Sequence, residues 1–243
     1  YAVSIVPSKL QHVATLQAKG AKITVILDTT AAATAVSDAA DKMDADLHCL
    51  IEIDCDGKRA GLNPTDLEIL RIADILRAAS RVQLDGVMTH AGGSYYCKTQ
   101  DEIIQFAEQE RRAITAAAAS LRAHGHACPI VSLGSTPTAT FAQNMDGITE
   151  VRAGVYVFQD MVMQALEVCT CDDIAISVLA SVISHNTAHN RILIDAGSLA
   201  LSADPGKPNH LGKSHYGQVC TADTGQVIPD LFVTSSNQEH GLI

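Results

Sequence analysis

The sequence has few basic residues, and this shortage excludes two classes of partner. Lysine and arginine together number 17 against 27 aspartates and glutamates, which gives a formal net charge of −10. Binding to nucleic acid or to an anionic membrane surface needs a basic stripe, and no segment of the sequence forms one. The sequence also contains no run of about 18 uncharged apolar residues, so no transmembrane helix is expected.

Three common signatures of nucleotide and ester chemistry are absent as well. There is no Gly-x-Gly-x-x-Gly after a strand, no Walker-type Gly-x-x-x-x-Gly-Lys-Ser/Thr and no Gly-x-Ser-x-Gly, so a dinucleotide site, a P-loop and a serine hydrolase are not expected. The seven cysteines include no Cys-x-x-Cys, and the one close pair, Cys169 and Cys171, lacks the spacing of a zinc site. Isolated thiols indicate a reducing compartment, and we therefore expect a cytoplasmic protein.

Apolar residues are plentiful, at 47% of 243 residues. A chain of this length buries about 70% of its unfolded surface, so a large core is available and disorder is excluded. Short β-type runs alternate with helical runs up to about residue 165, which predicts parallel strands with right-handed crossovers. The predicted strands are 1–6, 22–27, 47–53, 82–88, 129–133 and 148–151, with a further extended piece at 155–158.

Local signals place helices between these strands. Thr99 begins a capping-box sequence, residues 63–65 open a helix that ends near residue 79, and Pro137 stands at the start of another helix. The six strand–helix units are fewer than the eight of a closed (β/α)8 barrel. The α/β fold is therefore either an open sheet or a barrel with two units missing.

The pattern changes after about residue 172. Several β-type runs follow one another without an amphipathic helix between them, and glycines separate them. This pattern predicts a second, all-β domain. The runs are 173–183, 191–195, 215–220 and 226–233.

Polar groups and glycines gather just past the predicted parallel strands. They occupy segments 54–59, 90–95, 134–136 and 152–156, and Asp28 follows another strand. Ligands of parallel α/β domains bind at the carboxyl ends of the strands, which meet at one edge. We therefore expect an enzyme site at this edge.

The segment 133–138 is the sharpest of these signals. Gly134, Ser135 and Thr136 lead directly into a helix whose first N–H groups have no partner inside the helix. Backbone donors, hydroxyl groups and the helix dipole together bind phosphate. The alternative is an ordinary Ser/Thr N-cap that binds no ligand.

Further candidates follow other strands. Gly154 comes two residues after Arg152 and permits a second loop to approach the same phosphate. Arg59 is either a cation of the site or a solvated charge in a turn. His90, which is followed by two glycines and Tyr95, is a candidate acid–base group, and the alternative is a structural histidine.

Five segments of the chain carry a family resemblance. They are EIDCDGKRAGL (52–62), THAGGSYY (89–96), VSLGSTPT (131–138), EVRAGVYVFQD (150–160) and IDAGSLALSADPG (194–206). In this order they resemble the D-threonine aldolase and D-serine dehydratase family of pyridoxal-phosphate enzymes, which is related in fold to alanine racemase. The strings EVRAGVYVF and HAGGSYY favour the D-threonine aldolase branch.

The resemblance implies a domain organisation. Residues 1–168 would be a partial, cofactor-binding (β/α)8 barrel, and residues 169–243 a β domain that is incomplete at its C-terminal end. The lysine that bonds to the cofactor would precede Tyr1, and the ligands of a divalent metal (Mn, Mg or Zn) would follow the Glu-His-Gly at 239–241, so no metal ligand is assigned within the chain. The family also implies a homodimer.

The resemblance assigns residues of this chain to pyridoxal 5′-phosphate. Gly134, Ser135 and Thr136, together with Gly154 and Val155, would hold the phosphate group.

Other residues would surround the pyridine ring. Arg152 stands where the related racemases face the ring nitrogen, and Arg59 matches an arginine near the ring hydroxyl. Tyr95 and Tyr156 would lie beside the ring or the phosphate. His90 remains the candidate acid–base residue.

The expected reaction is the cleavage of a β-hydroxy-D-amino acid, with D-threonine giving glycine and acetaldehyde. One alternative is a D-serine dehydratase, which releases pyruvate and ammonia. A second is a non-catalytic relative that binds pyridoxal phosphate. A third, an amino-acid racemase, needs a tyrosine from the β domain, where Tyr216 is the one tyrosine available.

Overall fold

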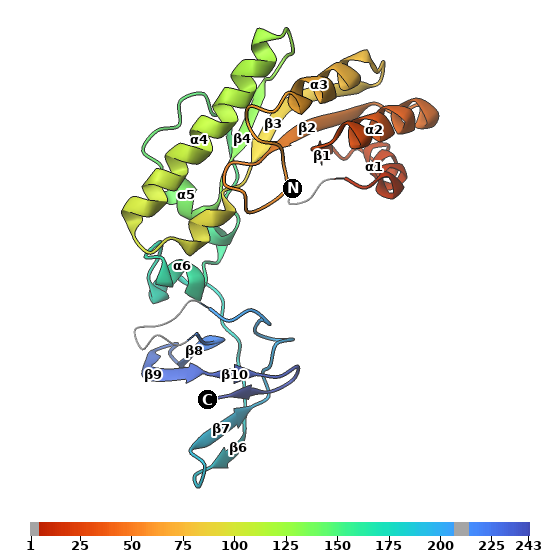
Figure 1. Cartoon of the computed structure of the whole chain (residues 1–243). Helices are drawn as coiled ribbons and strands as arrows, with labels where there is room; N and C mark the ends of the chain where they lie inside the picture. The colour runs from red at the N-terminus through yellow and green to blue at the C-terminus, as the bar shows by residue number, and fades with distance from the viewer. Residues whose placement is uncertain (1–4, 207–213) are drawn as a thin grey trace. The chain divides into compact units, whose positions relative to one another are not determined.

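The computed structural model describes residues 5–206 and 214–243 and contains two compact units, Tyr1–Gly154 and Val155–Ile243 (Figure 1). Each unit has its own sheets and its own hydrophobic core. The boundary that we predict after residue 168 concerns the domains of the whole protein and stays a prediction.

The first unit is a five-stranded parallel sheet with helices between its strands, as predicted. The strands pair in chain order from β1 to β5, and each pair is parallel. The strands are β1 (Thr24–Leu27), β2 (Leu47–Ile53), β3 (Val82–Thr89), β4 (Ile130–Leu133) and β5 (Glu150–Val151). The helices are η1 (Pro7–Lys9), α1 (Leu10–Gln17), α2 (Thr30–Met43), α3 (Glu68–Ala78), η2 (Gly92–Tyr96), α4 (Gln100–Ala123) and α5 (Thr136–Phe141).

The strand predicted at 1–6 lies mostly outside the described residues. At its end, the Ile5 N–H donates a hydrogen bond to the Ile26 carbonyl at 2.8 Å. The chain therefore pairs beside β1 at this point, on the edge of the sheet opposite to β5.

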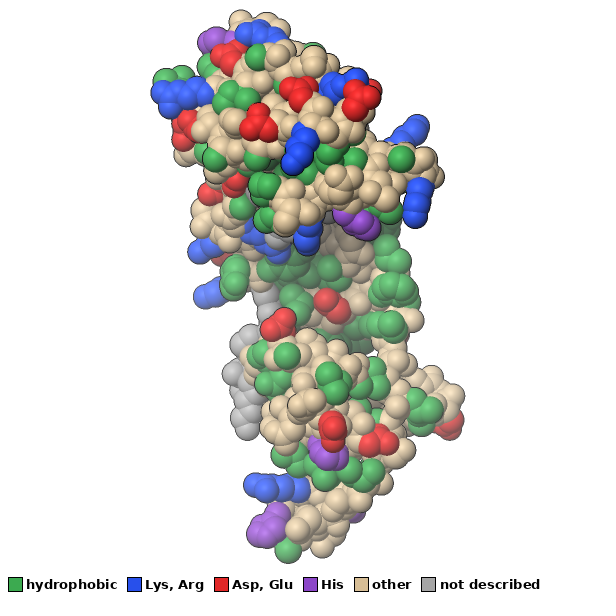
Figure 2. Space-filling view, turned by 90° about the vertical axis from the view of Figure 1, so that its right-hand side faces the viewer, with side chains coloured by type: hydrophobic (Ala, Val, Ile, Leu, Met, Phe, Trp, Pro, Cys, Tyr) green, Lys and Arg blue, Asp and Glu red, His purple; other side chains and the backbone are tan. Residues whose placement is uncertain are grey.

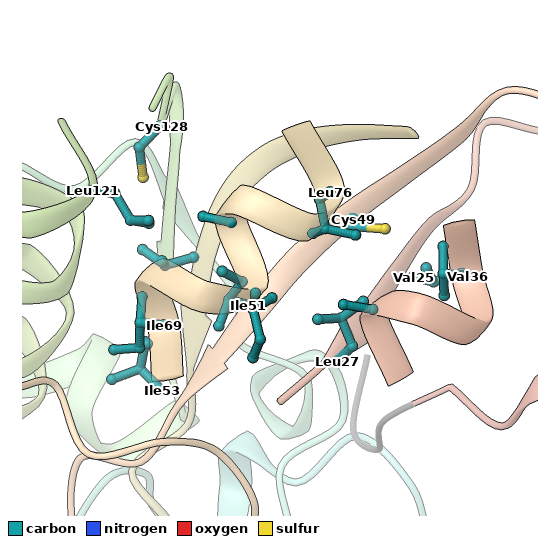
Figure 3. Packing of buried hydrophobic residues seen from close by; sticks show 14 of the residues in the cluster. Val25, Leu27, Val36, Cys49, Ile51, Ile53, Ile69, Leu76, Leu121 and Cys128 are labelled. Carbon is teal, nitrogen blue, oxygen red and sulfur yellow. The ribbon is translucent and has the colours of Figure 1, made fainter. Parts of the chain in front are cut away.

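Both faces of the parallel sheet are buried. Val25 and Leu27 of β1 belong to a large cluster shared with the helices, which Figure 3 shows from close by. Ile26 points to the other face and packs with Leu50 and Met88. Side chains alternate between faces along a strand, so a sheet covered on both sides needs nearly continuous apolar strands.

Capping side chains determine where two helices begin. The Thr99 hydroxyl accepts a hydrogen bond from the Glu102 N–H at 3.2 Å, and the Glu102 carboxylate accepts one from the Lys98 N–H at 2.6 Å. Thr99 thus caps α4 as predicted, but the capping box is not closed, because Glu102 bonds to the N–H of the residue before the N-cap. Ser135 caps α5, with its hydroxyl 3.3 Å from the Thr138 N–H.

Two local predictions in this region are wrong. The helix predicted to open at 63–65 begins at Glu68, because the Asn63 side chain accepts from the Thr65 N–H in a separate turn and Asp66 accepts from the Glu68 N–H. The piece at 155–158 predicted to be extended contains a 3-10 helix, η3 (Val155–Val157). Within the described residues no strand pairs with it, and an unpaired apolar segment has no ladder to make it a strand.

The second unit contains antiparallel sheets, which confirms the predicted β fold. One sheet has the order β10-β11-β7-β6, and β8 pairs with β9. The strands are β6 (Val182–Asn186), β7 (Arg191–Ile194), β8 (Gly217–Cys220), β9 (Val227–Val233), β10 (Ser235–Ser236) and β11 (Gly241–Leu242), and the helices are α6 (Met161–Ala165) and η4 (Cys171–Asp173). The β run predicted at 173–183 is thus mostly wrong, since a strand begins at Val182.

The surface of the first unit carries charges of both signs (Figure 2). On the face of the first unit in the upper part of Figure 2, acidic and basic side chains are interspersed. Among the helices of residues 5–206 and 214–243, none has the length and apolar character to cross a membrane.

Candidate functional site

The carboxyl ends of four strands meet at one edge of the parallel sheet. In the register, Ile53 of β2 lies beside Thr89 of β3, and Leu133 of β4 beside Val151 of β5. The segments that follow these strands contain most of the candidate residues, as the sequence predicts. Asp28, which follows β1, joins the same edge by accepting a hydrogen bond from the Gly61 N–H at 3.1 Å.

Gly134 lets the segments after β4 and β5 approach closely. Its φ is +137°, and a Cβ built there would lie 2.3 Å from the backbone oxygen of Arg152. The Arg152 N–H donates to the Leu133 carbonyl at 2.7 Å in the same region. Only glycine combines this φ with so short a distance to a neighbouring backbone.

A cluster of hydroxyl groups follows Gly134. The Ser135 Oγ lies 2.9 Å from the Thr138 Oγ1 and 3.0 Å from the Ser94 Oγ. The Ser135 N–H donates to the Thr138 hydroxyl at 3.2 Å, which completes the capping box. Ser135 and Thr136 are 2% and 1% exposed, so these hydroxyls form a buried polar cluster.

Glu110 of α4 completes this cluster from behind, although it is 1% exposed. Its carboxylate accepts hydrogen bonds from the N–H groups of Ala91 and Gly134, both at 3.1 Å, and from the Thr138 hydroxyl at 2.8 Å. Burial raises the pKa of the Glu110 carboxyl, and the hydrogen bonds from Thr138, Gly134 and Ala91 oppose this rise. A buried carboxyl group without such donors would be strongly unfavourable.

His90 lies between the ends of β3 and β4. Its Nδ1 is 3.0 Å from the Gly134 carbonyl, so Nδ1 carries the proton and donates, and Nε2 keeps its lone pair. Nε2 is buried and has no hydrogen-bond partner. Burial lowers the pKa of His90, the bond to Gly134 opposes this, and the charges of Arg59 and Arg152 lower the pKa further. The site therefore holds a neutral imidazole with an available acceptor.

The side chain of Arg152 is held by the hydroxyl of one residue and the backbone carbonyl of another. Its Nε donates to the Ser132 hydroxyl at 2.8 Å, and its guanidinium donates to the Thr89 carbonyl. The Ser132 hydroxyl in turn donates to the Glu150 carboxylate at 2.5 Å. The guanidinium is thus held at the ends of β3 and β4, close enough to His90 to affect its pKa.

The segments after β2 and β3 bring the remaining groups of the first unit together. A Cβ at Gly92 would lie 3.5 Å from the side chain of the exposed residue Arg59, and the Gly93 N–H donates to Asp56 at 2.6 Å. The rings of His90 and Tyr95 have centroids 6.1 Å apart and are tilted by 30°.

Three other predicted residues lie at or just past the boundary between the two units. Gly154 is exposed at the end of the first unit and has nothing within 4 Å of an ideal Cβ. Val155 and Tyr156 belong to the second unit, in η3, where Tyr156 is 57% exposed. Tyr216, the residue of the racemase alternative, packs against the small hydrophobic cluster of the second unit.

Four residues of this site were not predicted from the sequence: Thr89, Glu110, Ser132 and Thr138. One signal was available for Glu110. It occupies a position on the buried face of α4, which otherwise consists of isoleucine, leucine and three alanines. A charged residue on such a face needs buried partners.

The donor set fits an anionic ring cofactor. Two guanidinium groups, a neutral imidazole with an unpartnered buried nitrogen and a cluster of hydroxyls lie at one edge of the sheet. Among the residues that the structure describes, no three His, Cys, Asp or Glu side chains gather closely enough to hold a metal ion.

A parallel α/β unit with its polar groups at the carboxyl ends of the strands, followed by a β unit, defines a class of ligand-binding fold. The alanine racemase N-terminal domain family matches residues 6–161. The chain belongs to this family. A second family, described as "Putative serine dehydratase domain", matches residues 175–243, and the family resemblance predicted from the sequence is confirmed.

The relatives include dehydratases and an aldolase. The chain is similar to D-threo-3-hydroxyaspartate dehydratase from Delftia sp. HT23, at 42% identity over all of this chain and 64% of the relative, with a TM-score of 0.93 to its solved structure. It is 30% identical to D-serine dehydratase of Dictyostelium discoideum, over 85% of this chain and 55% of that protein. It is 29% identical to D-threonine aldolase of Arthrobacter sp., over 98% of this chain and 58% of that protein.

These identities do not favour the D-threonine aldolase branch, to which the two sequence strings pointed. The identity to the hydroxyaspartate dehydratase is the higher by a wide margin. The chain spans less than two thirds of the length of each of these relatives.

Proposed function

We propose that the full-length protein is a pyridoxal-phosphate-dependent lyase that removes water from a β-hydroxy-D-amino acid, with D-threo-3-hydroxyaspartate as its substrate. The observation that carries this proposal is the similarity to the Delftia dehydratase, which extends over the whole chain and both units. The gathering of Arg59, His90, Ser135 and Arg152 at one sheet edge supports the same conclusion.

The cofactor contacts keep the roles that the family resemblance implies. Gly134, Ser135 and Thr136 bind the phosphate, together with Gly154 and Val155.

The groups around the ring have separate roles. Arg152 offers a guanidinium that cannot turn away, because Ser132 and Thr89 hold it. Arg59 supplies a second positive charge near the ring, and Tyr95 and Tyr156 border it. When bound, pyridoxal phosphate supplies a ring that withdraws electrons from the substrate Cα.

His90 has the properties of a proton acceptor in this reaction. Its bond to the Gly134 carbonyl fixes the tautomer. Burial, helped by the charges of two nearby guanidinium groups, lowers its pKa and keeps the ring neutral. The free lone pair of Nε2 is then available at neutral pH to hold a proton from the substrate or from a bound water.

Aldol cleavage is the second candidate. The similarity to D-threonine aldolase of Arthrobacter sp. supports it. D-threonine would then give glycine and acetaldehyde by cleavage of the Cα–Cβ bond. A dehydratase instead expels the β-hydroxyl group and gives 2-oxobutanoate and ammonia from the same substrate.

Two properties of the whole protein are carried over from the family resemblance. A divalent metal assists the reaction, and the protein is a homodimer. A cysteine-to-alanine variant of a D-threo-3-hydroxyaspartate dehydratase has been solved in metal-free form, with a TM-score of 0.93 to this chain at 43% identity, over all of this chain and 64% of that one. Activity lost in EDTA and restored by Mn, Mg or Zn tests the metal, and light scattering tests the dimer.

The products of the purified, cofactor-loaded protein decide the reaction. We expect D-threo-3-hydroxyaspartate to give oxaloacetate and ammonia, and D-threonine to give little acetaldehyde. Arg152→Gln should abolish turnover because it removes the fixed guanidinium. Arg71→Gln is the matched control, since Arg71 is exposed and pairs with Glu68 on the surface of α3.

Three results would change the assignment. Glycine and an aldehyde as the main products establish the aldolase. Tight binding of pyridoxal phosphate without any turnover establishes the non-catalytic relative. Interconversion of D- and L-amino acids would establish the racemase.

A further inference from the structure

A buried carboxyl group supports the proposed phosphate site from behind. Glu110 lies in the middle of α4, which packs against β3, β4, α5 and η2. Removing a carboxylate from water is unfavourable unless several hydrogen bonds replace the water. Glu110 receives three such bonds, and each comes from a segment that borders the candidate site.

One oxygen of Glu110 joins two turns that are distant in the sequence. Oε1 accepts from the N–H of Ala91, which follows β3, and from the N–H of Gly134, which follows β4. The first turn carries His90 and the second carries Ser135. A single carboxylate oxygen therefore determines the separation of the two turns.

The second oxygen determines which hydroxyl hydrogen is available to a ligand. The Thr138 hydroxyl donates to Glu110 Oε2 at 2.8 Å, and the Ser94 hydroxyl donates to the Ala91 carbonyl at 2.8 Å. The hydroxyl hydrogens of Ser94 and Thr138, the two neighbours of Ser135, are therefore already used in hydrogen bonds to other acceptors. The Ser135 hydroxyl is left with a hydrogen that can turn between these neighbours and a bound group.

We infer that Glu110 is a positioning residue for the cofactor phosphate, because it holds the two turns together and leaves the Ser135 hydrogen for the phosphate oxygens. This inference rests on the proposed function, in which the residues after β4 bind pyridoxal phosphate. Glu110 itself does not touch the phosphate. Its effect reaches the ligand through Gly134, Ser135 and Thr138.

Comparing two ligands isolates this effect. Pyridoxal 5′-phosphate and pyridoxal differ by the phosphate group alone, so the ratio of their affinities measures what the phosphate site contributes. Both affinities are measured by absorbance titration of the full-length apoprotein. We expect Glu110→Leu to lower the affinity for pyridoxal phosphate by about tenfold or more, because one charge-assisted hydrogen bond contributes a factor of this size. The affinity for pyridoxal should stay unchanged.

The conservative variant should rescue binding. In Glu110→Gln, the amide oxygen still accepts from Ala91 and Gly134 and keeps the two turns together. The amide nitrogen donates to the Thr138 hydroxyl, whose own hydrogen can then turn to the Ser135 Oγ, so the Ser135 hydrogen stays available to the phosphate. The affinity ratio should therefore stay near that of the wild type. Glu108→Leu is the matched control, since Glu108 lies two residues earlier on the same helix and bonds to the partly exposed Arg111 and the exposed Arg112.

Each result is decisive. A wild-type protein that binds the two ligands equally overturns the proposed phosphate site itself. If the wild type prefers pyridoxal phosphate but Glu110→Leu lowers both affinities by the same factor, or lowers neither, only the inference about Glu110 is overturned. If Glu110→Leu does not fold, Thr138→Val decides, because it removes one bond of Glu110 and one partner of Ser135. If Thr138→Val has the same ratio of affinities for pyridoxal phosphate and pyridoxal as the wild type, the inference is also overturned.

Discussion

Replacing Gly134 with alanine should destabilise the protein more than the same change at a loop glycine of the first unit that has open space around it, such as Gly125. An L-residue held at a φ of +137° is strained by about 1–3 kcal/mol. The new Cβ would also lie 2.3 Å from the Arg152 oxygen, which forces the two segments apart. Loss of the Arg152-to-Leu133 backbone hydrogen bond adds about 1 kcal/mol.

The sum is roughly 2–4 kcal/mol, which lowers the melting temperature of a domain of this size by about 4–16 °C. Thermal unfolding followed by circular dichroism measures the shift. Gly125→Ala is the matched control, because Gly125 has a φ of +79° but no atom within 4 Å of an ideal Cβ. That variant carries the backbone strain without the collision.

The comparison of the two variants tests the close approach directly. Gly134→Ala should melt several degrees below Gly125→Ala and should also bind pyridoxal phosphate less tightly, since Arg152 is displaced. Equal melting temperatures for the two variants would refute the argument that the segments after β4 and β5 need a glycine at this contact.

Three further predictions concern the site and the thiols. Ser132→Ala removes one of the hydrogen bonds that hold the Arg152 guanidinium, so it should lower turnover, with a stability loss of about 1 kcal/mol. Unchanged kinetics would contradict this prediction. The fold lowers the pKa of His90, so at mildly acidic pH the unfolded chain binds a proton that the folded protein does not. The free energy of unfolding should therefore fall as the pH drops below about 6.5. His90→Asn should make that free energy, measured by urea unfolding, less dependent on pH in this range. Thiol reagents should label the exposed Cys220 quickly in the native protein, whereas the buried thiols react only after unfolding, and labelling of all seven at one rate would disprove this. Burial raises the pKa of two of these buried thiols, Cys49 and Cys55, to about 12.

Local sequence signals determined most of the first unit. The strand predicted at 47–53 coincides with β2, and the helix predicted after Thr99 begins at that cap. The turn after β4 contains the predicted N-cap at Ser135. These features depend on periodicity and on contacts within four residues, and both can be read from neighbouring positions.

Propensity alone was not sufficient where pairing decides the structure. The apolar segment 173–183 satisfies the composition of a strand, yet Leu179 is 82% exposed and regular pairing begins at Val182. A β-type segment becomes a strand when a partner strand supplies its hydrogen bonds and a second layer covers its side chains. Neither condition can be read from the segment itself.

The sequence by itself determined which residues follow each strand, and only the tertiary structure decided which of them touch. His90 meets Gly134 across 44 positions, and Arg152 meets Thr89 across 63. Glu110 reads in the sequence as one more charge on a long helix, because its three donors lie 19 to 28 positions away. Such contacts depend on how parallel strands align their ends, and this alignment is a property of the packed sheet.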